Sequence, residues 1–255
     1  MAAGIVTHIE RVATDPDRAA RQWDGYVEAL HHAGWTTVEV PAAPDCPDSA
    51  FIEDTMVVFR NVAVIARPGA DERKPETVAA EQVVESLGLS INRIRPPGTL
   101  DGGDVLKVPH PDGTATIYVG RGGRTNSEGI EQLRQILEPL GATVVTVPLT
   151  KVLHLKTAVT ALPDGTIIGY PPNIDDIGVF PRFLATPEES GSHVVLLGRN
   201  RLLMADDAPL TAAMLEGMGY ETVRVDISEF IKLEGCVTCL SVRLRELAGT
   251  NAAAR

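Results

Sequence analysis

Cysteine is scarce in this chain of 255 residues, which has three in all, Cys46, Cys236 and Cys239. So small and odd a number excludes a disulfide framework, and we therefore expect reduced thiols and a cytoplasmic location. Long apolar runs are missing as well: none reaches the length of a membrane span, and residues 1–20 lack the apolar core of a signal peptide. The sequence therefore gives no indication of a membrane partner.

Positive charge is also in short supply, because 23 Lys and Arg face 34 Asp and Glu, for a net charge of −11. Binding to a phosphate backbone needs a basic face, so nucleic acid is excluded as a partner. The acidity is compatible with a neutral or cationic small-molecule ligand, although many soluble enzymes are equally acidic for solubility alone. A hydrophobic content of 44% excludes a disordered chain and predicts a folded core, which we assign to one domain over residues 1–255.

A repeated unit organises the chain: a helix stops at a glycine and a short strand follows. The glycines are Gly34, Gly88, Gly141 and Gly219, each suited to the left-handed end of a helix. Hairpin patterns occupy residues 55–67, 104–119, 159–169 and 194–204, and the Pro-rich segment 170–192 after the third has little helical pattern. We predict five strand–strand–helix–strand units in an α/β fold, closed into a ring by strands over residues 4–9 and 237–244. The alternative is an ordinary α/β sandwich with coincidental repeats.

Two pairs of acids stand inside otherwise apolar stretches. Glu53 and Asp54 are predicted to lie in the middle of a strand, and Asp101 and Asp104 at the mouth of a hairpin. Burying a carboxylate is costly unless it meets a cation or hydrogen-bond donors. A planar guanidinium suits paired carboxylates best, and it comes either from a ligand or from the chain's own arginines.

The segment with two of the three cysteines, residues 232–244, is predicted as the last strand. A redox or zinc function for Cys236-x-x-Cys239 would need a helix start or a second ligand pair, and neither is visible. Side chains three apart on a strand point to opposite faces, so at most one thiol is expected to face a site. The other interpretation is that both are small buried hydrophobes.

Two further motifs carry candidate polar residues. His154 lies in the apolar, strand-like stretch 152–157 and is either a core histidine or an acid/base; no metal-ligand spacing surrounds it, so a metal site is not expected. Arg121-Gly122-Gly123-Arg124 is interpreted as a turn with an anion-binding arginine. The next residues, Thr125 to Glu128, have capping-box spacing and predict a helix start.

Taken together, these segments resemble the dimethylarginine dimethylaminohydrolases of the guanidino-modifying (pentein) superfamily. The resemblance spans nearly the whole chain in family order, over residues 47–54, 67–70, 100–105, 124–126, 153–156 and 234–242. It implies a five-bladed α/β propeller, a hydrolase of methylated arginine, and no metal or organic cofactor. The thiol would attack the guanidinium carbon, which gives a covalent thiouronium and then citrulline.

The resemblance also implies a role for each motif residue. It implies a catalytic set of Cys239 as nucleophile, His154 as general acid/base and Asp101 as its carboxylate. The residues that it implies for substrate binding are Glu53 and Asp54 for the guanidinium, Asp48 and the Leu233 carbonyl for the α-amine, and Arg73 and Arg124 for the carboxylate. Cys236 falls where the family has no catalytic residue, and Cys46 receives no role.

The family's N-terminal lid is the one part that the resemblance does not place, because residues 10–22 are short and polar here. Two alternatives remain at this stage: an arginine deiminase, and a binding protein on the same fold. Rapid alkylation of Cys239 near neutral pH would be expected of an enzyme with an acidic thiol and not of a binding protein. A homodimer is a further open possibility.

Overall fold

The computed structural model describes residues 4–245, and its strands form four separate three-stranded sheets. The strands are β1 (Met56–Phe59), β2 (Val62–Ile65), β3 (Ser90–Arg93), β4 (Val105–Pro109), β5 (Ala115–Arg121), β6 (Ala142–Pro148), β7 (Val159–Ala161), β8 (Ile167–Gly169), β9 (Phe183–Ala185), β10 (Val195–Gly198), β11 (Arg201–Ala205) and β12 (Glu221–Val225). The α-helices are α1 (Pro16–His32), α2 (Glu76–Ser86), α3 (Ser127–Leu137), α4 (Leu155–Ala158), α5 (Pro209–Gly217) and α6 (Ser228–Ile231).

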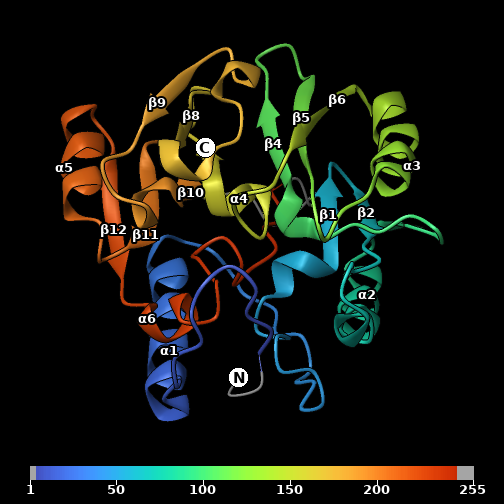
Figure 1. Cartoon of the computed structure of the whole chain (residues 1–255), viewed down its shortest axis with the longest axis horizontal. Coiled ribbons are helices and arrows are strands. Elements are labelled where there is room, and N and C mark those ends of the chain that lie inside the picture. Colours follow the sequence, from blue (N-terminus) through green and yellow to red (C-terminus); the bar gives the residue numbers. More distant parts are fainter. Residues whose placement is uncertain (1–3, 246–255) are drawn as a thin grey trace.

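Each sheet is the predicted unit, with an antiparallel hairpin and a third strand parallel to the second. The hairpins pair β1 with β2, β4 with β5, β7 with β8 and β10 with β11. Helices α2, α3 and α5 then cross over to β3, β6 and β12. Figure 1 shows these helices on the outside of the molecule and the strands nearer its middle. The strand–strand–helix–strand prediction is confirmed for these three units.

The helix stops were also predicted correctly. Gly34, Gly88, Gly141 and Gly219 all have φ between 83° and 93°, the left-handed region that glycine enters without a steric cost. The unit that begins at β7 has no α-helix between β8 and β9, and two short 3-10 turns, Pro171–Asn173 and Ile177–Val179, take its place. The degraded helix expected in segment 170–192 is thus observed.

The predictions fail in the unit made from the two ends of the described chain. No strand forms over residues 4–9, 36–40 or 237–244, and α1 is anchored by side chains instead. Tyr26 donates its hydroxyl proton to the Val237 carbonyl over 2.9 Å and lies 2.7 Å from the Ser241 hydroxyl. The β-branched and apolar residues from Val237 to Leu240 are buried by packing rather than by strand pairing.

Apolar clusters join each unit to the next one along the chain. Val105 and Ile117 of the second unit pack with Val64 of the first, and Tyr118 packs with Val159 of the third. Ile168 of the third unit packs with Leu202 of the fourth. A cluster at the fourth unit includes side chains of α1 and of the segment that ends in Cys239 and Leu240. The sheets therefore provide a continuous apolar support, while their connecting segments remain available for polar groups.

One local expectation, the N-cap of α3, also changes. Asn126, not Thr125, caps α3, accepting the Gly129 amide over 2.8 Å, while the Thr125 hydroxyl donates to Asp104 over 2.6 Å. Among the helices of residues 4–245, none combines the length and hydrophobicity that a bilayer crossing requires.

Candidate active site

A small pocket gathers residues from six segments that lie far apart in the sequence. Seven of the nine predicted site residues line it, and Glu53 and Asp101 lie just behind its wall. Its lining consists of Ile5, Asp48, Phe51, Asp54, Arg73, Arg124, Leu153, His154, Leu233, Glu234, Gly235 and Cys239. The pocket lies at connections rather than at strand centres, because the backbone there is free to turn side chains toward one point.

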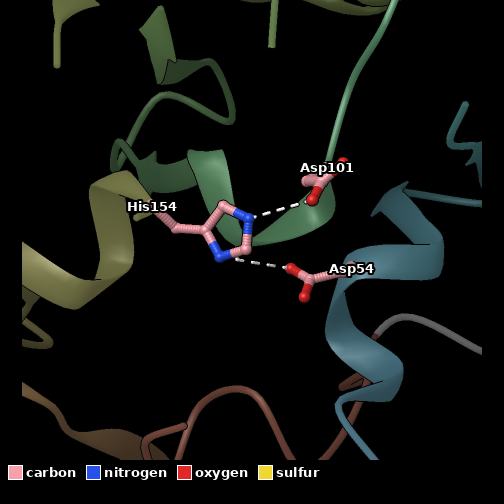
Figure 2. Close-up of side chains that lie close together, drawn as sticks. All are labelled: Asp54, Asp101 and His154. Atoms are coloured by element: carbon pink, nitrogen blue, oxygen red, sulfur yellow. Dashed lines mark hydrogen bonds and ion pairs between the residues drawn. The ribbon is translucent and has the colours of Figure 1, made fainter. Parts of the chain in front are cut away.

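His154 lies between two carboxylates (Figure 2). Its Nε2 is 3.0 Å from Asp101 Oδ2, and its Nδ1 is 3.7 Å from Asp54 Oδ1. Burial disfavours the charged ring, but Asp54, Asp101 and Asp104 outweigh it and raise the pKa of His154 to about 9. The ring is therefore an imidazolium at neutral pH, with both nitrogens protonated and directed at carboxylates.

The backbone around His154 differs from the predicted strand. His154 is extended at the residue before the short helix α4, and the Leu155 amide at the start of α4 donates to Asp104 Oδ1 over 3.0 Å. Burial raises the pKa of Asp104 to about 7, against the opposing effects of His154 and the Thr125 hydroxyl. Asp104 thus fixes the backbone that presents His154. The sequence contained this acid in its motif, but nothing in the pattern distinguished its role from that of Asp101.

Position 103 requires glycine because Asp54 and His154 approach its backbone closely. The Gly103 amide donates to Asp54 Oδ1 over 2.8 Å, and a Cβ at this residue would lie 2.5 Å from that oxygen and 2.7 Å from His154 Nδ1. Gly103 belongs to the 3-10 helix η3 (Gly102–Asp104). Its missing side chain lets η3, His154 and Asp54 pack at van der Waals distance.

Glu53 and Asp54 lie in the 3-10 helix η1 (Ile52–Thr55) before β1, not in the middle of a strand. This turn sends their side chains to different partners. Glu53 Oε1 accepts Lys156 Nζ and Arg243 Nη2, each over 2.6 Å, and Oε2 accepts the Thr238 hydroxyl over 2.9 Å. The Glu53 amide also donates to the Cys239 carbonyl over 3.1 Å. Glu53 thereby ties η1 to the cysteine segment.

Asp54 faces both the pocket and the guanidinium of Arg73. Its Oδ2 accepts Arg73 Nη1 over 2.5 Å. Burial works against the charge of Asp54, but His154 and Arg73 dominate and lower its pKa well below the usual range. Asp54 is therefore a permanent anion in the pocket at every pH near neutrality.

The two predicted arginines differ in how fully they are engaged. Arg73 donates to both Glu76 oxygens as well as to Asp54, and its Nη2 also reaches the carbonyls of Asp48 and Phe51 at 3.3 and 3.2 Å. Arg124 makes one hydrogen bond with the residues that the structure describes, from Nη1 to Asp101 Oδ2 over 3.4 Å. Both guanidinium groups are buried at the pocket wall. Arg124 is thus the arginine with more free N–H donors.

The two thiols meet, contrary to the strand-based prediction that they diverge. Residues 236–239 form a turn, in which the Cys239 amide donates to the Cys236 carbonyl over 3.0 Å. Cys236 Sγ and Cys239 Sγ are 3.3 Å apart, and only Cys239 lines the pocket. The hydrogen bond with Cys236, burial, and the charges of Glu53 and Asp54 all raise the pKa of Cys239. Slow alkylation at neutral pH therefore does not distinguish a binding protein from an enzyme here.

A segment near the start of the described chain covers part of the pocket. The Ile5 amide donates to both oxygens of Asp48, over 3.2 and 3.0 Å. The amides of Thr7 and His8 donate to the Glu234 carboxylate over 2.8 and 2.7 Å. Glu234 itself has φ of 61°, in the left-handed region. The covering residues thus precede the segment 10–22 where a lid was sought, and Pro16 to Gln22 of that segment belong to α1.

Most of the chain is similar to known proteins. Searched against protein-family models, the chain matches none. It is 63% identical over 247 residues to an N(G),N(G)-dimethylarginine dimethylaminohydrolase of Streptomyces coelicolor, covering 97% of this chain and 94% of the relative. It is 32% identical to the Pseudomonas aeruginosa protein of the same name, over 90% of this chain and 89% of that one. The chain belongs to the dimethylarginine dimethylaminohydrolase family.

Solved structures of this family superpose on the chain. A His-to-Gly variant of a dimethylarginine dimethylaminohydrolase, in an adduct with S-methyl-L-thiocitrulline, has a TM-score of 0.87 at 30% identity, covering 95% of this chain and 94% of that one. A Cys-to-Ser variant of the Pseudomonas aeruginosa protein, in complex with citrulline, has a TM-score of 0.85 at 31% identity, with the same coverage. The N-terminal domain of ArgZ, at 20% identity, shares the fold, with a TM-score of 0.80. The α/β fold of the family is thus established for this chain.

Asp54, Asp101 and His154 are also the one group within residues 4–245 whose ligand atoms lie close enough to hold a metal ion. A metal ligand must offer a lone pair, and an imidazolium with both nitrogens protonated has none. The raised pKa of His154 favours the protonated ring, so a metal ion would have to displace a proton in order to bind there.

Proposed function

We propose that the protein hydrolyses Nω-methylated arginine, that is, asymmetric dimethylarginine and monomethylarginine, to citrulline and dimethylamine or methylamine. The observation that carries the proposal is the 63% identity to a dimethylarginine dimethylaminohydrolase over 97% of the chain. The pocket supports it chemically, because it combines a thiol, an acid and buried carboxylates around one small volume. One domain over residues 1–255 carries the activity in this proposal.

Asp54 of η1 holds the guanidinium of the substrate directly, and Glu53 supports it without lining the pocket. Asp54 lines the pocket as an anion, and Glu53 stands behind it beside Lys156 and Arg243. Carboxylates fix the plane of a guanidinium and leave its central carbon exposed. The guanidinium of the substrate is positively charged, so the Asp54 carboxylate pairs with the substrate as well as with Arg73.

The amino-acid end of the substrate meets Asp48, Leu233, Arg73 and Arg124. Asp48 already accepts an N–H from Ile5 in the pocket, which is the kind of donor that an α-ammonium offers. The Leu233 carbonyl is the second acceptor in the proposal, and Leu233 lines the pocket. Arg124 has donors to spare for the carboxylate, while Arg73 contributes mainly its charge, since Asp54 and Glu76 occupy most of its donors.

Cys239 and His154 carry the bond changes. The cation of the bound substrate favours ionisation of the Cys239 thiol, whose pKa is raised in the free protein. The thiolate attacks the guanidinium carbon, and the imidazolium of His154 gives its proton to the departing amine, which leaves a thiouronium on Cys239. His154, now neutral, takes a proton from water, whose oxygen attacks the same carbon, and citrulline leaves as the thiol re-forms. Asp101 orients the ring through its 3.0 Å contact.

The finer architecture in the proposal is a five-bladed ring, with α1 and both end segments as the fifth blade. The apolar clusters support it. One cluster joins the fourth sheet to α1 and to Leu240, and another joins the first sheet to Val242 and Leu244. The chain's end segments therefore bridge the last unit and the first. The hydrogen bonds from the Thr7 and His8 amides to Glu234 join the first segment of the described chain to the segment that carries Cys239.

The test is a substrate panel with the purified protein. The ureido product is measured from four substrates: citrulline from asymmetric dimethylarginine, monomethylarginine and arginine, and the corresponding ureido amine without a carboxylate from agmatine. Cys46→Ser is a control that leaves the pocket untouched. The proposal predicts turnover of the two methylated substrates and none of agmatine, which has no carboxylate for Arg124. Turnover of arginine alone would make the protein a deiminase, and turnover of none of the four would contradict the proposal.

A further inference from the structure

The chain carries a second thiol against the proposed nucleophile. Cys236 Sγ lies 3.3 Å from Cys239 Sγ, and both are buried, at 2% and 5% exposure. The proposed hydrolysis uses Cys239 alone, so this contact is unexplained by it. The chain's third cysteine, Cys46, is buried elsewhere and takes no part in this contact.

We propose that Cys236 is a resolving thiol, so that a peroxide converts the Cys236–Cys239 pair into a reversible disulfide that switches the enzyme off. The backbone is already suited to it. The Cys239 amide donates to the Cys236 carbonyl over 3.0 Å, which closes a turn from residue 236 to residue 239. The Cα atoms at the ends of such a turn lie less than about 7 Å apart, which overlaps the separation that a disulfide spans.

The two sulfurs have unequal access, and this assigns their roles. Cys239 lines the pocket and Cys236 does not, so a small oxidant that enters the pocket reaches Cys239 first. The Cys239 thiolate attacks one peroxide oxygen, the O–O bond breaks, and a sulfenic acid and hydroxide form. The Cys236 thiolate then attacks the sulfenic sulfur, the S–O bond breaks, and hydroxide leaves as the disulfide forms. In total, two thiols and one hydrogen peroxide give one disulfide and two molecules of water.

The hydrogen bonds around Cys236 support its part in this sequence. Thr238 donates its hydroxyl proton to Glu53 Oε2 over 2.9 Å, and its oxygen lies 3.2 Å from Cys236 Sγ. Since that hydroxyl has one proton, the Cys236 thiol is the donor of the two. Thr238 and Cys239 thus flank Cys236 on both sides, which holds its sulfur beside Cys239 instead of allowing it to rotate away. The sulfurs need to approach by about 1.3 Å to bond.

Peptide mass spectrometry tests the proposal on the intact, folded protein. Reduced wild type is exposed to hydrogen peroxide, alkylated in denaturant and digested with trypsin, which releases both cysteines in the peptide of residues 233–243. The expected result is an unalkylated peptide that is lighter than the reduced one by two hydrogen atoms, together with a fall from three free thiols to one. Cys46→Ser is the control and is expected to form the same peptide. Alkylation of both cysteines, or a peptide with added oxygens, would overturn the proposal.

Reversibility supplies a second readout. Wild type inactivated by peroxide is expected to regain at least about four-fifths of its turnover on treatment with dithiothreitol, since a disulfide is reducible. Cys236→Ser and Cys236→Ala are expected to be inactivated without recovery, because the sulfenic acid of Cys239 then proceeds to sulfinic acid. Equal recovery in wild type and variants would contradict a resolving role. The peptide mass does not depend on turnover, so failure of the proposed function and failure of this inference are separable.

Discussion

The four sheets and the connections that carry the pocket bury different kinds of residue. In the sheets the buried side chains are almost all apolar, as in β2, whose four residues are Val, Ala, Val and Ile. The connections bury charged side chains as well as apolar ones: Glu53, Asp54, Asp101, Asp104, Arg73 and His154 are all at most 4% exposed. Apolar burial is non-directional and tolerant, whereas a buried charge needs a specific partner at a specific distance.

The connections show how such partners are found. The two acids of η1 divide their roles, Asp54 toward the pocket and Glu53 toward Lys156 and Arg243. The acids at η3 do the same, Asp101 toward His154 and Asp104 toward the backbone of α4. In each pair one acid serves the chemistry and the other fixes the segment that presents it. The two regions should therefore respond differently to substitution.

Cys239→Ser gives the largest expected effect on activity. Turnover of asymmetric dimethylarginine is expected to fall by about four orders of magnitude or more, since a hydroxyl is a far weaker nucleophile than a thiolate. The thermal midpoint is expected to stay within about 5 °C of wild type, because the side chain keeps its size. Citrulline assays and calorimetry check the two parts. The matched control is Cys46→Ser, and equal losses in both variants would remove the distinction between site and scaffold.

Asp101→Asn is expected to reduce turnover by about 10²–10⁴-fold, the usual contribution of a positioned acid/base. The amide removes the charge that pairs with His154 at 3.0 Å while keeping the shape of the side chain. The pH profile of the residual activity should shift to lower pH, since the pKa of His154 loses one of its supporting charges. A variant whose profile keeps the wild-type midpoints would show that Asp101 serves the fold alone. Asp112→Asn, on an exposed turn, is the control.

Ile117→Ala tests the opposite region. Ile117 is fully buried in β5, so its truncation is expected to lower the free energy of unfolding by about 2–5 kcal/mol. The kcat of the folded variant should be within about twofold of wild type, because no charged contact of the pocket changes. Urea unfolding and citrulline assays at low temperature measure both. A large loss of kcat in fully folded protein would contradict the separation of the two regions.

Glu234→Gln gives the smallest expected effect. The carboxylate accepts the amides of Thr7 and His8, and an amide side chain weakens these charge-assisted bonds by about 1–2 kcal/mol. We expect the KM for methylated arginine to rise about tenfold while kcat changes little, because Glu234 holds the segment that places Ile5 at the pocket and takes no part in the bond changes. The control is Glu39→Gln at an exposed position. An unchanged KM would show that this covering segment does not affect binding.

The same contrast explains what could be predicted from sequence. The hairpins, the helix stops at Gly88 and Gly141, and the missing helix before β9 follow from local patterns, and each was predicted correctly. The errors fall in the connections. Residues 52–55 and 236–242 have the composition of strands, but they turn, and their buried polar groups meet partners that are distant in the sequence. Glu53 pairs with Lys156 and Arg243, and the Thr238 hydroxyl donates to Glu53. A strand propensity is a local quantity and does not contain those partners.

The meeting of the two thiols belongs to the same class of error. Residues three apart on a strand diverge, but the turn at residues 236–239 brings Cys236 and Cys239 to 3.3 Å. The family resemblance identified Cys239 as the nucleophile without indicating this contact. Similarly, the acid/base residue could be named from the resemblance, while Asp104 and Glu234 could not be given roles. Their functions depend on which backbone amides donate hydrogen bonds to them, and the sequence does not show those contacts.

The protonation of His154 tests most directly the claim that buried carboxylates in the connections set the chemistry. The folded-state pKa of about 9 exceeds the ordinary 6.5. Protonation of His154 therefore stabilises the folded state fully below pH 6.5, and this contribution to the free energy of unfolding is lost as the pH rises through 9. It amounts to about 3 kcal/mol. An NMR titration of ring-labelled histidines, assigned with His154→Asn, measures the pKa of His154. The account predicts a midpoint near pH 9 for this ring, and a midpoint at or below 6.5 would contradict it.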